Sequence, residues 1–161
     1  MSWASELLSR LGGRRQTPFS PGDQLVCSGE TWTVSAVVTE QAGGREWPTV
    51  GLTRGAETIW ITVDGDDVVR YEPLPDARLG ADESLTWNGR TYTASERGSY
   101  TVTSVSGATE ATVGDHATYL TLTNAQDAGH WISVEQWEGG PTEVSVARPW
   151  RIDQIMPPGR S

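Results

Sequence analysis

The chain has 161 residues and a formal net charge of −9, because 12 basic side chains face 21 acidic ones. This length fits one ordinary domain, or two small ones packed together. The negative balance argues against a nucleic-acid-binding protein, which needs a basic face to displace counterions from phosphates, and it disfavours attachment to anionic lipid. Cationic partners such as polyamines, metal ions or basic protein surfaces are electrostatically permitted, although solubility is the plainer role of such charge.

The cysteine count and the N-terminal sequence indicate the compartment. Cys27 is the only cysteine, so neither an internal disulfide nor a cysteine-based zinc site can form. The first residues lack the basic and apolar regions of a signal peptide, and no stretch approaches the roughly 20 apolar residues that span a membrane. The sequence therefore predicts a cytoplasmic protein without direct membrane insertion.

Residues 1–20 predict a short helix followed by a linker. Trp3, Leu7 and Leu11 recur with helical spacing and would form one apolar stripe, which a pair of glycines then ends. A helix this short is marginal alone, so it either docks or frays. Docking on a partner is one use for the stripe, and a frayed tail is the other interpretation.

From residue 21 onward the apolar pattern has period two, and a stretch of it recurs. Leu25–Val34 returns as Leu85–Ala94, at a constant offset of 60 residues. Each copy contains an apolar strand end, a tight turn with glycine, and an alternating strand with an aromatic residue at one fixed place. Asn88-Gly89 in the second copy is a strong signal for a type I′ hairpin turn. The pattern predicts two related hairpins.

A second correspondence extends the repeat. Trp60–Val63 matches Trp131–Val134 at an offset of 71 residues, compared with an offset of 60 for the hairpins. The difference, 71 minus 60, means that the second copy carries about 11 more residues between these two strands. We predict an all-β protein of two tandem duplicated, barrel-like or sandwich-like modules packed together, with a single larger sandwich as the alternative. The module bounds and the loose tail are 21–76, 82–156 and 157–161.

Eight tryptophans are the most unusual feature of the composition. Period two places Trp60 and Trp131 on the face opposite Ile61 and Ile132, and these isoleucines suit a core. The two tryptophans either pack the modules together or form platforms for sugars, bases or cations. Trp137, directly before a glycine turn, is a further candidate for a surface contact.

The acidic residues provide candidates for chemistry, but no catalytic motif contains them. Glu96 and Glu135 are candidates for a ligand site or for a carboxylate pair. Asp64–Asp67 lacks the ligand spacing of a calcium loop, and His116 and His130 lack a zinc-binding spacing. We therefore expect no metal and no cofactor, and binding rather than catalysis.

Several segments also resemble a known family. They are LTWNGRTYTASERGSYTVTSVSG, TYLTLT, HWISVEQWEGG and EVSVARPWRIDQI in the second half, and GDQLVCSGETWTV, EWPTVGLT and TIWITVD in the first. Together they resemble DUF4178, a bacterial domain of unknown function, over about residues 20–156. The resemblance implies an E-x-G element at Glu96 and Gly98, a W-[IL]-S-x-E strand at Trp131–Glu135, and an aromatic hairpin. It supplies no catalytic residue. Metal-type cysteines of some relatives are absent here, so no zinc ribbon is implied.

The resemblance also implies a setting. Members of the family are often encoded beside small membrane proteins of the DUF350 type and polyamine aminopropyltransferase-like enzymes. We therefore expect a non-enzymatic accessory or scaffold protein of a membrane-linked or stress-related bacterial system, docking through the stripe in residues 1–20. The second hypothesis is a small-ligand module for a polyamine or a carbohydrate that uses the three tryptophans. The third is a hydrolase or lyase built on Glu96 and Glu135.

Overall fold

The computed structural model describes residues 19–64 and 67–158, and within them the fold is all-β without a helix. The predicted N-terminal helix, with Trp3, Leu7 and Leu11, lies outside the described residues. The strands are β1 (Gln24–Cys27), β2 (Glu30–Ala42), β3 (Arg45–Arg54), β4 (Glu57–Asp64), β5 (Asp67–Pro73), β6 (Ser84–Trp87), β7 (Arg90–Gly107), β8 (His116–Asn124), β9 (Asp127–Trp137), β10 (Thr142–Pro149) and β11 (Gln154–Met156).

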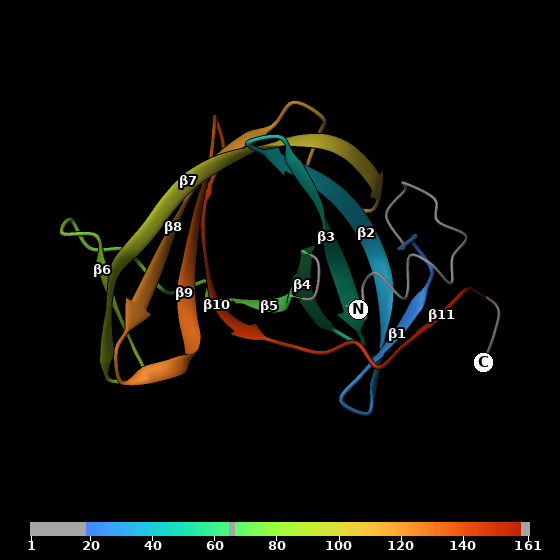
Figure 1. Cartoon of the computed structure of the whole chain (residues 1–161), viewed down its shortest axis with the longest axis horizontal. Helices are drawn as coiled ribbons and strands as arrows, with labels where there is room; N and C mark the ends of the chain where they lie inside the picture. Colours follow the sequence, from blue (N-terminus) through green and yellow to red (C-terminus); the bar gives the residue numbers. More distant parts are fainter. Residues whose placement is uncertain (1–18, 65–66, 159–161) are drawn as a thin grey trace.

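Eight of these strands close into an antiparallel barrel (Figure 1). The wall runs β2, β3, β4, β5, β10, β9, β8, β7, and the pairing of β7 with β2 closes it. The remaining strands extend the wall on two sides, with β11 and β1 beside the start of β2 and β6 beside the start of β7. Closure removes the open edges that an eight-stranded sheet would otherwise expose.

The two halves of the chain therefore share one barrel, whereas the sequence predicted two modules packed side by side. The lengths of β2 and β7 explain the difference, because each strand changes partner along its course. The first residues of β2 pair with β1, and Ala36–Gln41 pair with β7. A second seam joins β5 to β10. Near the C-terminus, β11 pairs with β1, so part of the predicted second module completes the first half.

Both predicted hairpins form. In the first, Leu25 lies opposite Trp32, and in the second Leu85 lies opposite Tyr92. Asn88 and Gly89 both have positive φ, at 51° and 76°, as a type I′ turn requires. Each hairpin strand then carries a register shift, between Val34 and Ala36 in β2 and between Ala94 and Glu96 in β7. Such bulges bend a strand and increase its twist, which lets β2 and β7 curve from one partner to the next.

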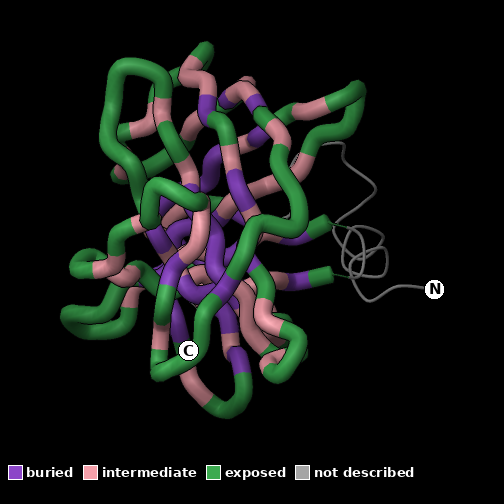
Figure 2. The backbone as a smooth tube through the Cα atoms, turned by 90° about the vertical axis from the view of Figure 1, so that its left-hand side faces the viewer, coloured by how far each residue is buried: buried purple, intermediate pink, exposed green. Residues whose placement is uncertain are grey.

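Two apolar cores, one in each half, hold the wall together, and Figure 2 shows the buried segments gathered in the interior. The predicted core residues Ile61 and Ile132 are fully buried, one in each core. Phe19, which the sequence pattern assigned to a linker, is buried in the first core. The first core comprises Phe19, Leu25, Cys27, Trp32, Val34, Val37, Val50, Leu52, Ile59, Ile61, Val63, Val68 and Ile152, and the second comprises Leu85, Tyr92, Leu120, Leu122, Ile132, Val134, Val144 and Val146.

Candidate ligand-binding cavity

The strands that build the cores also line a cavity of about 490 Å³. In β4 the alternate residues Ile59 and Ile61 belong to the first core, whereas Trp60 and Thr62 line the cavity. In β10 the same alternation assigns Val144 to the second core and Glu143 to the cavity. Period two therefore separates an apolar face from a polar and aromatic face. Here the polar face lines a cavity that is partly open to solvent.

The cavity lining is acidic and aromatic. No arginine and no histidine is among the described residues that line it. Its carboxylates are Glu40, Glu110, Asp115, Glu135, Glu138 and Glu143, and its aromatic residues are Trp60, Tyr71 and Trp137.

Glu40, on β2, is the most deeply buried of these carboxylates, with 5% of its surface exposed. Trp47 donates its Nε1 hydrogen to Glu40 Oε1 over 3.1 Å, and the Thr49 hydroxyl donates to the same oxygen. Burial raises the pKa of Glu40 above its ordinary value, and these hydrogen bonds only partly oppose the rise. The two donors fix the carboxylate in one orientation toward the interior of the barrel.

Glu135, on β9, lies within electrostatic reach of Glu40. Burial, together with the negative charge of Glu40, raises the pKa of Glu135 to about 8. Glu143 adds a smaller contribution in the same direction, since it lies directly opposite Glu135 on β10. Two interacting carboxylates in a poorly solvated site cannot both ionise easily, so the pair retains a proton near neutral pH.

Tyr100, on β7, is not part of the cavity lining, but it interacts with both carboxylates. Its hydroxyl is buried and makes no hydrogen bond of ordinary geometry with any described residue. Burial, followed by the charges of Glu135 and Glu40, raises the pKa of Tyr100 far above its ordinary value. The phenol is therefore a neutral donor held beside the two acids. Its polar atom interacts with both carboxylates and holds them together with the phenol in one polar cluster.

Aromatic rings hold Tyr100 in place on three sides. Trp137 meets it edge to face with ring centroids 5.7 Å apart, and Trp47 does so at 6.2 Å. Tyr119, on β8, stacks against it at 6.3 Å. Such pairs favour defined geometries, so the ring cluster restricts where the Tyr100 hydroxyl can lie.

Trp60 and Tyr71 form a second aromatic part of the wall. The two residues are cross-strand neighbours on β4 and β5, and the Thr62 hydroxyl donates to Tyr71 Oη over 3.5 Å. Burial raises the pKa of Tyr71 to about 12, which keeps this phenol neutral as well. The indole of Trp60 lies across Gly51, where an added Cβ would meet two of its ring atoms at 3.2 Å. Glycine on β3 thus gives the indole room to lie over the sheet.

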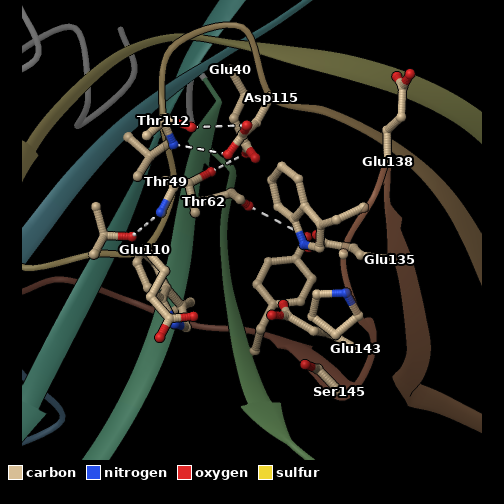
Figure 3. A pocket seen from close by; sticks show the side chains of 18 of the residues that line it. Glu40, Thr49, Thr62, Glu110, Thr112, Asp115, Glu135, Glu138, Glu143 and Ser145 are labelled. Atoms are coloured by element: carbon tan, nitrogen blue, oxygen red, sulfur yellow. Dashed lines mark hydrogen bonds between the residues drawn. The ribbon is translucent and has the colours of Figure 1, made fainter.

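Two chain segments form the more exposed part of the cavity, the loop at 108–115 and the turn at 138–141. In the loop, Asp115 accepts hydrogen bonds from the backbone and hydroxyl of Thr112, at 2.8 and 2.9 Å, so this carboxylate serves the loop itself. Glu110 and Glu138 are exposed, and Figure 3 shows Glu138 extending away from the other labelled side chains. The carboxylates therefore form a buried group and an exposed group.

A comparison with protein families identifies the chain. The family model for the domain of unknown function DUF4178 matches residues 20–151, which include β1 to β10 and every residue that lines the cavity. The chain belongs to the DUF4178 family. No curated protein and no solved structure gives a significant match.

The DUF4178 fold brings together three of the five candidate site residues. Trp60, Trp137 and Glu135 all line the cavity. Trp131 follows the alternation of β9 onto the same face as Glu135, but it is not part of the lining and pairs with Ala147.

Glu96 is the other candidate residue outside the lining. It is exposed on β7, and it accepts a hydrogen bond from the Tyr119 hydroxyl over 3.4 Å. Glu96 and Glu135 therefore do not form a carboxylate pair in the cavity wall.

Sequence reasoning missed Glu40, Tyr71, Tyr100 and Glu143. A weak signal existed for Glu40, because it shares a strand face with Val38 at the end of a mainly apolar run. A similar signal existed for Glu143, since hairpin pairing around the turn at 138–141 places it opposite Glu135. No local pattern could show that β2, which carries Glu40, and β10, which carries Glu143, line one cavity of a closed barrel.

The DUF4178 domain shows neither a metal centre nor a membrane span in its described part. No group of three or more histidine, cysteine, aspartate or glutamate side chains among the described residues could hold a metal ion. The same residues contain no helix that is both long and apolar enough to cross a membrane.

Proposed function

We propose that the protein is a binding module whose central cavity takes a small organic cation. The observation that carries this proposal is the composition of the lining, which has six carboxylates and, among the described residues, no basic side chain. A concave site with one sign of charge focuses the electrostatic potential and attracts ligands of the opposite sign. The net charge of −9 acts in the same direction at longer range.

The aromatic wall favours an organic cation over a bare ion. Trp60, Tyr71 and Trp137 supply large ring surfaces next to the carboxylates. Rings of this kind attract ammonium groups through their negative faces and also cover apolar parts of a ligand. The volume of about 490 Å³ is within the range of ordinary small-molecule sites, which is about 300–1,000 Å³. A carbohydrate, the other ligand class expected from the tryptophans, would offer no positive charge to the acidic lining.

Other sequence-based expectations stay proposals beside this one. A binding module is compatible with an accessory role in the cytoplasm, next to a small membrane protein of the DUF350 type or a polyamine aminopropyltransferase-like enzyme. Descent of the two halves from one duplicated module is supported by their equivalent hairpins and by bulges that follow Val34 and Ala94. The proposed binding rests on the cavity residues and depends neither on the accessory role nor on the duplication.

Titration calorimetry at low ionic strength tests the proposal. Choline, putrescine and spermidine are the cationic probes, and glucose is the uncharged control. We expect at least one cation to bind and glucose not to bind. Substituting Glu135→Gln should weaken the binding, whereas Glu72→Gln makes the same charge change on an exposed residue of β5 outside the lining and should weaken it much less. Absence of heat with every cation, or equal losses in both variants, would contradict a cation-binding cavity.

A further inference from the structure

We propose that the ligand is a linear diamine or polyamine with two distinct ammonium positions. One ammonium group lies between Glu40 and Glu135. The carbon chain lies along Trp60 and Trp137, and a second ammonium group lies next to Glu143. This inference rests on the proposed function, which it narrows from organic cations in general to one class.

The inner position consists of the carboxylates of Glu40 and Glu135 and the hydroxyl of Tyr100, all of which can accept hydrogen bonds. Trp47 and Thr49 donate to the same oxygen of Glu40, Oε1. The hydroxyl of Tyr100, buried beside Glu40 and Glu135, has no hydrogen-bonding partner of ordinary geometry. A primary ammonium group has three hydrogens in a compact head, so it can donate to both carboxylates and to the phenol oxygen. The Tyr100 hydroxyl interacts with both carboxylates, so these three polar groups form one cluster that an ammonium group can join.

The charge of the inner pair explains why a proton and an ammonium group compete. Without a ligand, the pair lowers its repulsion by keeping one proton, and burial assists because it raises the pKa of both carboxyls. When an ammonium group enters, its positive charge offsets both carboxylates, and the carboxyl proton of the pair leaves to the buffer. No covalent bond changes other than this O–H bond.

The groups that face the inner pair supply no competing positive charge. Tyr100 from β7 and Tyr71 from β5 are neutral phenols, and Tyr119 from β8 lies opposite Glu135 in the strand pairing. Glu143 from β10 is a further charged neighbour and is acidic as well. None of the arginines among residues 19–64 and 67–158 lines the cavity, so an incoming ammonium group would not displace an ion pair formed by those residues.

The outer position follows from strand register. Glu143 lies directly opposite Glu135, and side chains in such pairs have Cβ atoms about 4.5–5.5 Å apart. Glu143 is exposed while Glu135 is half-buried, so the pair leads outward from the inner position. Trp60, Tyr71 and Trp137 line the same cavity and offer ring surfaces to methylene groups. A compact cation would contact only one position and leave the rings uncovered.

Calorimetry with matched amines tests this arrangement, using putrescine, cadaverine and spermidine against butylamine, which keeps the chain and loses the second ammonium. We expect the diamines to bind about tenfold or more tightly than butylamine, because a second charge pair forms. Repeating the titrations near neutral pH in buffers of different ionisation enthalpy should show close to one proton released per ligand. Glu135→Gln should abolish that release, and the exposed Glu143→Gln should reduce the preference for diamines while butylamine binding persists.

Each result separates the two proposals. If butylamine binds as tightly as putrescine, or if diamines bind without proton release, the inference is wrong and the cation cavity stands. The same holds if choline binds and linear amines do not. If no organic cation binds, both fail. Circular dichroism and thermal unfolding of each variant establish that the fold is intact, and Glu143→Gln, on an exposed side chain, provides the variant least able to disturb it.

Discussion

The two faces of the barrel wall differ sharply although the same strands supply both. One face carries Ile59, Ile61 and their equivalents in the second half, packed in two apolar cores. The other face carries Trp60, Glu135 and the remaining cavity residues. The apolar face gains free energy by removing hydrocarbon from water, whereas the cavity face buries carboxylates at a cost. The apolar face of the strands therefore stabilises the fold, and the cavity face carries the proposed binding.

This difference predicts that variants on the two faces fail in different ways. Cavity variants should change binding and pH dependence while the protein stays folded, and core variants should change folding first. A buried acidic pair that lowers stability without a ligand is the expected signature of a site kept for binding.

The largest expected effect is on the apolar face. Ile132→Ala removes a fully buried side chain from the second core, and we expect it to lower the free energy of unfolding by about 2–5 kcal/mol. Ser145→Ala, on the cavity face of β10, is the matched control and should change the stability by less than about 1 kcal/mol. Urea denaturation measures both, and similar losses in the two variants would remove the distinction between the faces.

The next effect is the pH dependence of stability in the ligand-free protein. The pKa of Glu135 rises from an ordinary value of 4.5 to about 8 in the folded state. Between pH 4.5 and about 8 the folded chain therefore binds more protons than the unfolded chain. The stabilisation that comes from proton binding at Glu135 is fully present below the pKa of the unfolded chain, and it is lost as pH rises through about 8. We expect a loss on the order of 2 kcal/mol, moderated by solvent access.

Glu135→Gln should flatten that pH profile, because the amide does not titrate. The readout is the urea midpoint measured from acidic to mildly alkaline pH. Glu72→Gln, outside the lining, should retain the wild-type slope. A wild-type profile that is flat over the same range would show that the buried pair does not hold a proton.

The smallest expected effect concerns a positioning residue. Trp47→Phe keeps a ring next to Tyr100 but removes the Nε1 donor to Glu40. One ordinary hydrogen bond contributes about 1 kcal/mol, and Thr49 still donates to the same oxygen, so we expect about threefold to tenfold weaker amine binding. Proton release per bound ligand should stay close to that of the wild type, since Glu135 is unchanged. A larger loss of stability than of affinity would assign Trp47 to the fold alone.

Much of the local structure could be predicted from the sequence, because it depends on neighbouring residues. Alternation identified Ile61 and Ile132 as core residues, and Asn88-Gly89 identified a hairpin turn. The closure of the barrel could not be predicted in the same way. It depends on β2 and β7 changing partners along their length, which is a long-range property.

The candidate site was predictable only in part for the same reason. Glu135, Trp60 and Trp137 were recognised from unusual residue types next to strand patterns. Glu40 and Tyr100 were missed, since their significance arises from meeting across the β2–β7 seam rather than from any motif. Glu96 and Trp131 lie on suitable strands but outside the lining. Residue type and period two thus indicate a face, and only the closed barrel shows which parts of that face converge.

The most direct test of the cavity as a binding site is a crystal structure of the protein grown with cadaverine. We expect one amine nitrogen between the carboxylates of Glu40 and Glu135, within hydrogen-bonding distance of the Tyr100 hydroxyl, and methylene groups against Trp60 and Trp137. A cavity without the amine at saturating concentration, or an amine bound only outside the barrel, would contradict the account.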